Sequence, residues 1–130
     1  MSHKDKHGIE YSDCSHTDTL LRFFPSLIPK FDGIYSRKND IVLPTESFAE
    51  SWTSANGIDI IVFRLETLIE HAINLWGEIK ISKRDSSYSV NYTVKQVTYY
   101  IYSSSLVDVV AKSLISRYEN TFTKEVTKFT

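Results

Sequence analysis

The sequence has few residues that could cross-link the chain or restrict its backbone. It contains one cysteine, Cys14, with three prolines and four glycines among 130 residues. A single cysteine excludes an intramolecular disulfide and any metal site built from several cysteines, and it is typical of a reducing compartment. We therefore expect a cytoplasmic protein.

Long apolar segments are also missing. The run Ile60–Phe63 contains four residues, whereas a membrane-spanning helix needs about 20 apolar residues. The first residues, 1–8, are charged rather than apolar. For these reasons we expect neither a membrane span nor a signal peptide.

The overall composition is that of an ordinary globular domain, with 42% hydrophobic and 24% charged residues. A chain of this length can bury roughly two-thirds of its unfolded surface, which is enough for a stable core without disulfides or a structural metal ion. Residues 1–16 are polar, and we predict a flexible arm there. Residues 17–130 are predicted to form a single α+β domain.

The net charge of −1 conceals an uneven distribution of charge along the chain. Residues 40–78 contain no lysine and a single arginine, Arg64, whereas residues 79–130 carry a net positive charge. The acidic residues of the first segment are Asp40, Glu46, Glu50, Asp59, Glu66, Glu70 and Glu78. If their side chains share a face, that face would attract a basic protein surface.

Short helices are predicted in the N-terminal half. Residues Thr19–Phe24 follow candidate capping residues, and Pro25 should end this helix because proline disfavours helical geometry in the residue before it. Residues Glu46–Ser54 are predicted as a second helix, since Glu46 would lie near its positive N-terminal end.

The strongest helical pattern lies in the middle of the chain. Apolar residues recur at three- and four-residue steps up to Trp76, and Gly77 is typical of the residue that ends a helix. We predict a helix over Ile58–Trp76. The alternative is a strand over Ile58–Leu65, because its β-branched residues favour extended structure.

After Gly77 the pattern changes to an alternation of apolar and polar residues, which predicts strands between residues 79 and 102. The alternation slips by one residue at Lys95-Gln96, and either a tight turn or a bulge would explain the slip. Ser105 and Asp108 then form the start of a capping box, which predicts a last helix reaching about Asn120.

Together these elements predict an α+β fold. Its parts are a helical N-terminal half, a central helix, a small antiparallel two- or three-stranded sheet and a C-terminal helix. Because so small a sheet is not stable alone, we expect one of its faces to pack on the two long helices.

Five of the eight tyrosines fall in or beside the predicted sheet, namely Tyr88, Tyr92, Tyr99, Tyr100 and Tyr102. The alternation groups the first three with valines that would face the helices. It leaves Tyr100 and Tyr102 on the outer face. Exposed tyrosines suit a protein interface or base stacking, because each has a flat apolar ring and a polar hydroxyl.

Four potential metal ligands occur near the N-terminus: His3, His7, Cys14 and His16. Their spacing matches no specific metal motif. We therefore interpret any metal binding there as adventitious, and we expect neither a metal site nor a cofactor.

Motifs typical of enzymes are missing from the sequence, including a phosphate-binding loop, a nucleophile elbow and a dinucleotide-binding fingerprint. Glu66, Glu70 and His71 on the central helix are the best candidates for acid–base chemistry. The two carboxylates fall on the polar side of that helix, and His71 is expected to be partly buried and hydrogen-bonded. An enzyme is thus an alternative to the protein-binding domain that the acidic segment favours.

The order of a helix, two or three strands and a helix between residues 58 and 120 resembles the layout of double-stranded RNA-binding domains. Those domains carry several lysines at the start of the last helix, whereas residues Ser103–Asp108 contain none. Nucleic acid is therefore disfavoured as a partner. A nucleic-acid-binding module is a further alternative, with Lys80, Lys83, Arg84 and Lys95 as its basic residues.

We expect a non-catalytic protein-binding domain, such as an inhibitor or an immunity or antitoxin-like protein. It would neutralise a protein partner with a basic surface, for example a nuclease, through its acidic segment. The predicted contact residues are Asp40, Glu46, Glu50, Trp52, Asp59, Glu66, Glu70, Tyr100 and Tyr102.

Overall fold

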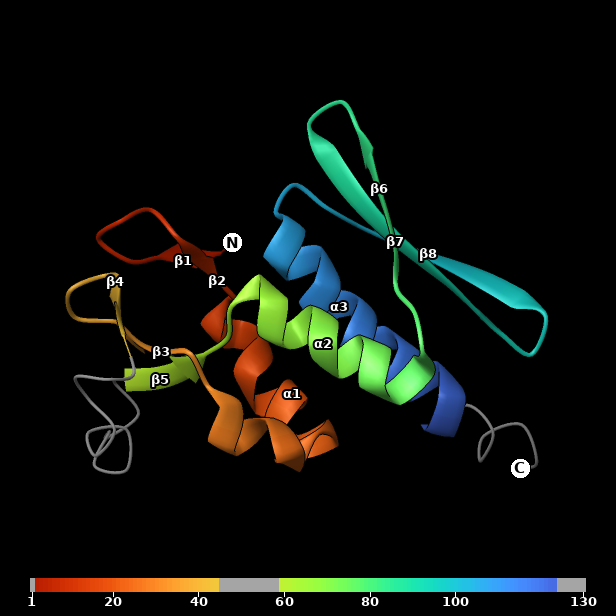
Figure 1. The fold of residues 1–130 in the computed structure, drawn as a ribbon, viewed down its shortest axis with the longest axis horizontal. Coiled ribbons are helices and arrows are strands. Elements are labelled where there is room, and N and C mark those ends of the chain that lie inside the picture. Colours follow the sequence, from red (N-terminus) through yellow and green to blue (C-terminus); the bar gives the residue numbers. More distant parts are fainter. Residues whose placement is uncertain (1, 45–58, 124–130) are drawn as a thin grey trace.

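The computed structural model describes residues 2–44 and 59–123. Within these ranges the chain forms helices and three separate antiparallel sheets (Figure 1). The helices are α1 (Thr17–Phe23), α2 (Leu65–Trp76) and α3 (Leu106–Tyr118), with the 3-10 helices η1 (Cys14–His16) and η2 (Pro25–Lys30) and the π-helix η5 (Glu119–Thr123). The strands are β1 (His3–Lys4), β2 (Glu10–Tyr11), β3 (Gly33–Ser36), β4 (Ile41–Pro44), β5 (Asp59–Val62), β6 (Lys80–Arg84), β7 (Ser87–Val94) and β8 (Val97–Ser103).

The predicted fold class is wrong in its N-terminal half. That half is not purely helical, because it contains the hairpin β1–β2 and a sheet of order β4-β3-β5. The helices are spread along the chain, and the meander β6-β7-β8 is one of three sheets. The pairing of Ile34 with Ile61 brings together residues far apart in the sequence, which local patterns do not reveal. The predicted helix Glu46–Ser54 lies outside the described residues.

The predicted helix Ile58–Trp76 is also wrong at its start. Asp59–Val62 forms β5, paired antiparallel with β3, and the helix begins only at Leu65. The strand alternative was correct for this segment because pairing with β3 satisfies the backbone while Ile61 and Val62 become buried. The end of the helix is confirmed: Gly77 has φ 82° and adopts the left-handed conformation.

Residues 2–16, expected to form a flexible arm, carry the β1–β2 hairpin in the structure. Its turn is organised by Asp5, whose Oδ1 accepts hydrogen bonds from the backbone N–H groups of His7 (2.8 Å) and Ile9 (3.1 Å). The buried Tyr11 donates its hydroxyl to Asp5 Oδ2 at 3.1 Å. These polar contacts give order to a segment that has almost no apolar residues.

The main core lies between the helices and the inner face of the β6-β7-β8 sheet. Side chains from α1, α2, α3 and this sheet, with Ile34 of β3 and Ile61 of β5, form one buried cluster. Leu20, Leu68, Val90 and Leu114 are among its members. Figure 1 shows α2 and α3 lying side by side, with the meander next to α3. Among the helices of the described residues, none is long and apolar enough to cross a membrane.

The slip in the alternation at Lys95-Gln96 is explained by a tight turn. Val94 pairs with Val97 across a two-residue connection, so β7 and β8 form a hairpin and the sheet has three strands. Lys95 and Gln96 both have positive φ values, 52° and 69°. Such a turn matches the twist of a hairpin, but it usually contains glycine or asparagine because other residues are strained there.

Candidate functional site

The outer face of the β6-β7-β8 sheet is the candidate site. Side chains alternate between the two faces of a strand, and the inner residues Val90 and Tyr92 are buried against the helices. Their immediate neighbours therefore point the other way. We call this outer face the tyrosine face; its residues are Lys80, Ser82, Arg84, Ser87, Ser89, Asn91, Thr93, Thr98, Tyr100 and Tyr102.

Tyr100 and Tyr102 dominate the tyrosine face. They lie two residues apart on β8, which places them about 7 Å apart along the strand. Their exposed fractions are 59% and 62%, whereas Tyr92 on the inner face is buried. The alternation therefore predicted correctly which tyrosines point outward. Two large aromatic side chains are presented together on a regular strand.

The strand register places polar side chains beside the two rings. Tyr100 pairs with Asn91, which pairs with Lys80, and Tyr102 pairs with Ser89. Farther along the face, the Thr93 and Thr98 hydroxyls lie 3.0 Å apart and share a hydrogen bond. The three strands contain no carboxylate. The face is therefore aromatic, rich in hydroxyl groups and mildly basic.

The inner face fixes this sheet on the helices. Tyr92 Oη forms a hydrogen bond with Ser116 Oγ and accepts another from Asn120 Nδ2 at 2.7 Å. The guanidinium of Arg117 lies over the rings of Trp76 and Tyr92, at 4.7 and 5.5 Å from their centroids. These contacts join β7 to α2 and α3, so the tyrosine face is carried by a sheet anchored from behind.

Basic residues of the meander divide between its two faces. Lys80 and Arg84 belong to the tyrosine face, while Lys83 lies on the opposite face with its ammonium 5.6 Å from the centre of the Tyr88 ring. The sequence predicted one set of basic residues, but the strand register shows that they lie on two different faces of the sheet. The same register identifies Asn91 and the serines, which the sequence reasoning missed.

The predicted acidic contact residues lie on several elements. Glu66 and Glu70 are exposed on α2, where Glu66 lies 3.7 Å from Arg64. Asp40 lies in the turn between β3 and β4 with φ 52°, and its Oδ1 accepts a hydrogen bond from Tyr35 at 2.9 Å. Asp59 begins β5. The remaining two acidic residues, Glu46 and Glu50, lie outside the described residues, as does the predicted contact residue Trp52.

The side chains of Glu66, Glu70 and His71, the candidates for acid–base chemistry, do not point into a common site. Glu66 and Glu70 are exposed, whereas His71 is buried and its ring packs edge-on against Phe24, 4.8 Å between centroids. His71 Nε2 has no hydrogen-bond partner among the described residues, contrary to expectation. Burial lowers the pKa of His71, and the nearby Lys30 lowers it further. This arrangement favours a neutral histidine within the core.

One group of side chains in the described ranges could hold a metal ion: His3, Asp13 and Cys14, whose ligand atoms all lie within 4.8 Å of one another. His3 and Cys14 were among the potential ligands predicted from the sequence, whereas Asp13 was not. The other two predicted ligands, His7 and His16, do not belong to this group. Folding of the β1–β2 hairpin selects the members, so spacing along the chain could not identify them.

Comparisons of the chain with protein-family models, with curated proteins and with solved structures give no match.

Proposed function

We propose that this chain is a non-catalytic protein-binding domain that contacts its partner through the tyrosine face. The observation that carries the proposal is the pair Tyr100 and Tyr102, both largely exposed on a sheet that the helices support from behind. Large exposed aromatic side chains on a monomer surface are typical of contact sites. Binding would remove both rings from water.

The composition of the tyrosine face suits recognition of a protein surface. Tyrosine provides a large contact area at a small cost in conformational entropy, while serine and asparagine form adaptable hydrogen bonds. Ser82, Ser89 and Asn91 surround the two tyrosines in the register of the sheet. Because these side chains lie on strands, little backbone ordering is needed when a partner binds.

The proposal keeps the more specific role that the acidic segment predicted, an inhibitor or immunity-like protein in the cytoplasm. Glu66 and Glu70 are exposed on α2 and give the domain an acidic surface of its own. Such carboxylates raise the association rate with a basic partner, such as a nuclease, and make that rate sensitive to salt. The tyrosine face then supplies the packed contact.

Binding of single-stranded nucleic acid is a second candidate, favoured by one observation. Lys80 and Arg84 lie on the same face as Tyr100 and Tyr102. Basic side chains next to exposed aromatic rings can hold phosphates while bases stack on the rings. The start of α3 has no lysine and includes the buried Asp108, so the mode of double-stranded RNA-binding domains is not available here.

The test is affinity capture of the tagged protein from its native cells, with bound proteins quantified by mass spectrometry. The wild type is compared with the double variant Tyr100→Ser/Tyr102→Ser. Ile73→Ser is the matched control, because it removes an exposed apolar side chain from α2 instead. We expect one stoichiometric protein that the control retains and the double variant loses.

Two outcomes would overturn the proposal. Equal capture of the partner by all three proteins would exclude the tyrosine face. Recovery of nucleic acid, with protein partners lost after nuclease digestion, would favour the second candidate. Charge reversal at Glu66 and Glu70 tests the inhibitor role separately, since it should weaken capture most at low salt.

A further inference from the structure

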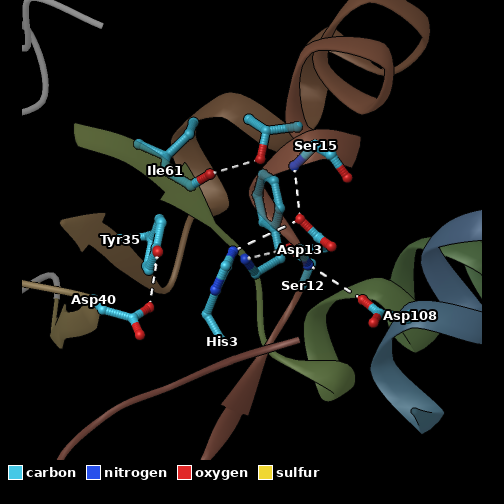
Figure 2. A network of polar contacts seen from close by, with 10 residues as sticks. His3, Ser12, Asp13, Ser15, Tyr35, Asp40, Ile61 and Asp108 are labelled. Atoms are coloured by element: carbon cyan, nitrogen blue, oxygen red, sulfur yellow. Dashed lines mark hydrogen bonds and ion pairs between the residues drawn. The ribbon is translucent and has the colours of Figure 1, made fainter. Parts of the chain in front are cut away.

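Three side chains with different metal-binding groups meet where the β1–β2 hairpin contacts the rest of the molecule. His3 comes from β1, Asp13 immediately precedes η1, and Cys14 is its first residue. Their nitrogen, oxygen and sulfur ligand atoms all lie within 4.8 Å of one another. Figure 2 shows the imidazole of His3 pointing towards Asp13.

The separation of His3 and Asp13 fits two ligands of one ion better than a hydrogen bond. His3 Nε2 lies 3.7 Å from Asp13 Oδ1, beyond the usual hydrogen-bond limit of about 3.2 Å. Two ligand atoms, each about 2.1 Å from a tetrahedral ion, lie about 3.4 Å apart. A shift of a few tenths of an ångström would therefore bring both atoms to ligating positions.

His3 Nε2 is the second observation that points to a ligand. This nitrogen is buried and has no hydrogen-bond partner among the residues that the structure describes. Buried polar atoms are nearly always paired. A metal ion between His3 and Asp13 would satisfy the nitrogen without any change of fold.

The surroundings hold the ligands in place. The His3 ring stacks on Tyr35, with 3.6 Å between centroids and an angle of 13° between planes. Asp13 Oδ1 accepts a hydrogen bond from the backbone N–H of Ser15 at 2.9 Å, and the Asp13 N–H donates to Asp108 Oδ1 at 3.2 Å (Figure 2). Such outer contacts fix ligand orientation in metal sites.

Charged groups of both signs surround His3. Burial lowers its pKa, the carboxylates of Asp13, Asp40 and Asp108 act in the opposite direction, and the positive N-terminus lowers the pKa further. A histidine must be neutral to bind a metal. The carboxylates of Asp40 and Asp108 add negative potential near the group, which would stabilise a divalent ion.

We propose that His3, Asp13 and Cys14 form a binding site for a divalent transition metal, with Zn²⁺ the best fit. Imidazole and thiolate ligands favour zinc over magnesium or calcium, which prefer oxygen ligands. Three protein ligands leave a fourth position for water or a partner's side chain. A hollow of about 510 Å³ lies on one side of this group and is lined by His3 but not by Asp13 or Cys14. This site does not depend on the tyrosine face.

The test is a competition titration with Zn²⁺ against a chromogenic chelator, using the full chain without a polyhistidine tag. We expect one equivalent to bind, and at least about tenfold weaker binding in His3→Gln and Cys14→Ser, since loss of even an outer contact weakens metal sites 10- to 100-fold. His7→Gln is the matched control, because His7 is exposed in the same hairpin. It should bind as tightly as the wild type.

Cobalt substitution of the wild type gives an answer that does not depend on folded variants. Bound Co²⁺ should show a thiolate charge-transfer band and the visible spectrum of a tetrahedral ion. Several weak equivalents, equal losses in His7→Gln and His3→Gln, or bound Co²⁺ without a thiolate band would each overturn the proposal. Circular dichroism of each variant separates loss of ligand from loss of fold.

Discussion

The two halves of the molecule share an apolar core but differ in the hydrogen bonds that accompany it. In residues 65–121 the helices α2 and α3 and the sheet β6-β7-β8 bury apolar side chains in one cluster, and neighbouring strands are joined by short turns. In residues 2–44, with β5, apolar side chains such as Leu20 and Ile34 join the same cluster, and the buried Ser12 and Thr17 also form hydrogen bonds to distant parts of the chain. We call residues 65–121 the apolar half and residues 2–44 with β5 the polar half, because the polar half adds these specific hydrogen bonds to the shared core.

The polar half is connected through residues far apart in the sequence. Ser12 Oγ accepts from the Phe63 N–H at 3.0 Å, and the Thr17 hydroxyl donates to the Ile61 carbonyl at 2.9 Å. Asp32 Oδ2 accepts from the Arg64 N–H at 2.8 Å. Contacts of this kind specify one arrangement, because an unpaired buried group is costly. We infer that this half supplies the metal-binding group and the other half supplies the contact surface.

The largest effect is expected from the apolar half. Leu114 is completely buried on α3, and Leu114→Ala should lower the free energy of unfolding by about 2–5 kcal/mol because it leaves a cavity. Urea denaturation measures this change. Leu75→Ala, at an exposed position on α2, should cost less than about 0.5 kcal/mol; similar losses at both positions would contradict the assigned core.

A smaller loss is expected when the polar half is disturbed. Ser12→Ala removes the acceptor of the buried Phe63 N–H and should cost about 1–3 kcal/mol. The control is Ser26→Ala at an exposed position in η2. If Ser12→Ala is as neutral as the control in urea denaturation, specific hydrogen bonds do not hold the N-terminal half.

The hairpin turn of the meander offers a gain in stability. Gln96 has φ 69°, and Gln96→Gly should raise the free energy of unfolding by about 0.5–1 kcal/mol, since glycine adopts this conformation without strain. Thermal denaturation would detect a higher Tm. Gln96→Val should lower it, because a β-branched residue is most strained at positive φ; the reverse order would contradict this turn.

A graded loss of stability is expected on acidification. Burial lowers the pKa values of His3, His16 and His71 below the 6.5 of an exposed histidine. The unfolded chain therefore binds protons more readily, and the free energy of unfolding should fall as the pH drops below about 6.5. His71→Leu should reduce the slope between pH 7 and pH 5. If the free energy of unfolding, measured by urea denaturation, changes with pH equally in His71→Leu and the wild type, His71 does not contribute to the pH dependence.

The same comparison explains what could be predicted from the sequence. The N-cap of α3 at Ser105, the C-cap of α2 at Gly77 and the outward position of Tyr100 follow from signals within a few residues. In the β4-β3-β5 sheet, the pairing of β5 with β3 was missed because residues 37–58 separate the two strands in the sequence. Hydrogen bonds such as that of Ser12 to Phe63 have no periodic pattern.

The tyrosine face and the metal-binding group also differ in how far local sequence signals can predict them. Tyr100 and Tyr102 lie on one strand, so alternation was enough to place them together. Asp13 joins His3 only after the hairpin β1–β2 folds back, and no spacing rule connects these residues with Cys14. The sequence could therefore predict the contact surface but not the metal-binding group.

The most direct test of the account is site-specific photo-crosslinking in the native cells. A benzophenone amino acid replaces Tyr100 in one protein and Ile73, exposed on α2, in another. We expect a single major protein adduct from position 100 and none of comparable yield from position 73. An adduct with that protein formed only from position 73, or adducts to nucleic acid alone from position 100, would contradict a protein contact through the tyrosine face.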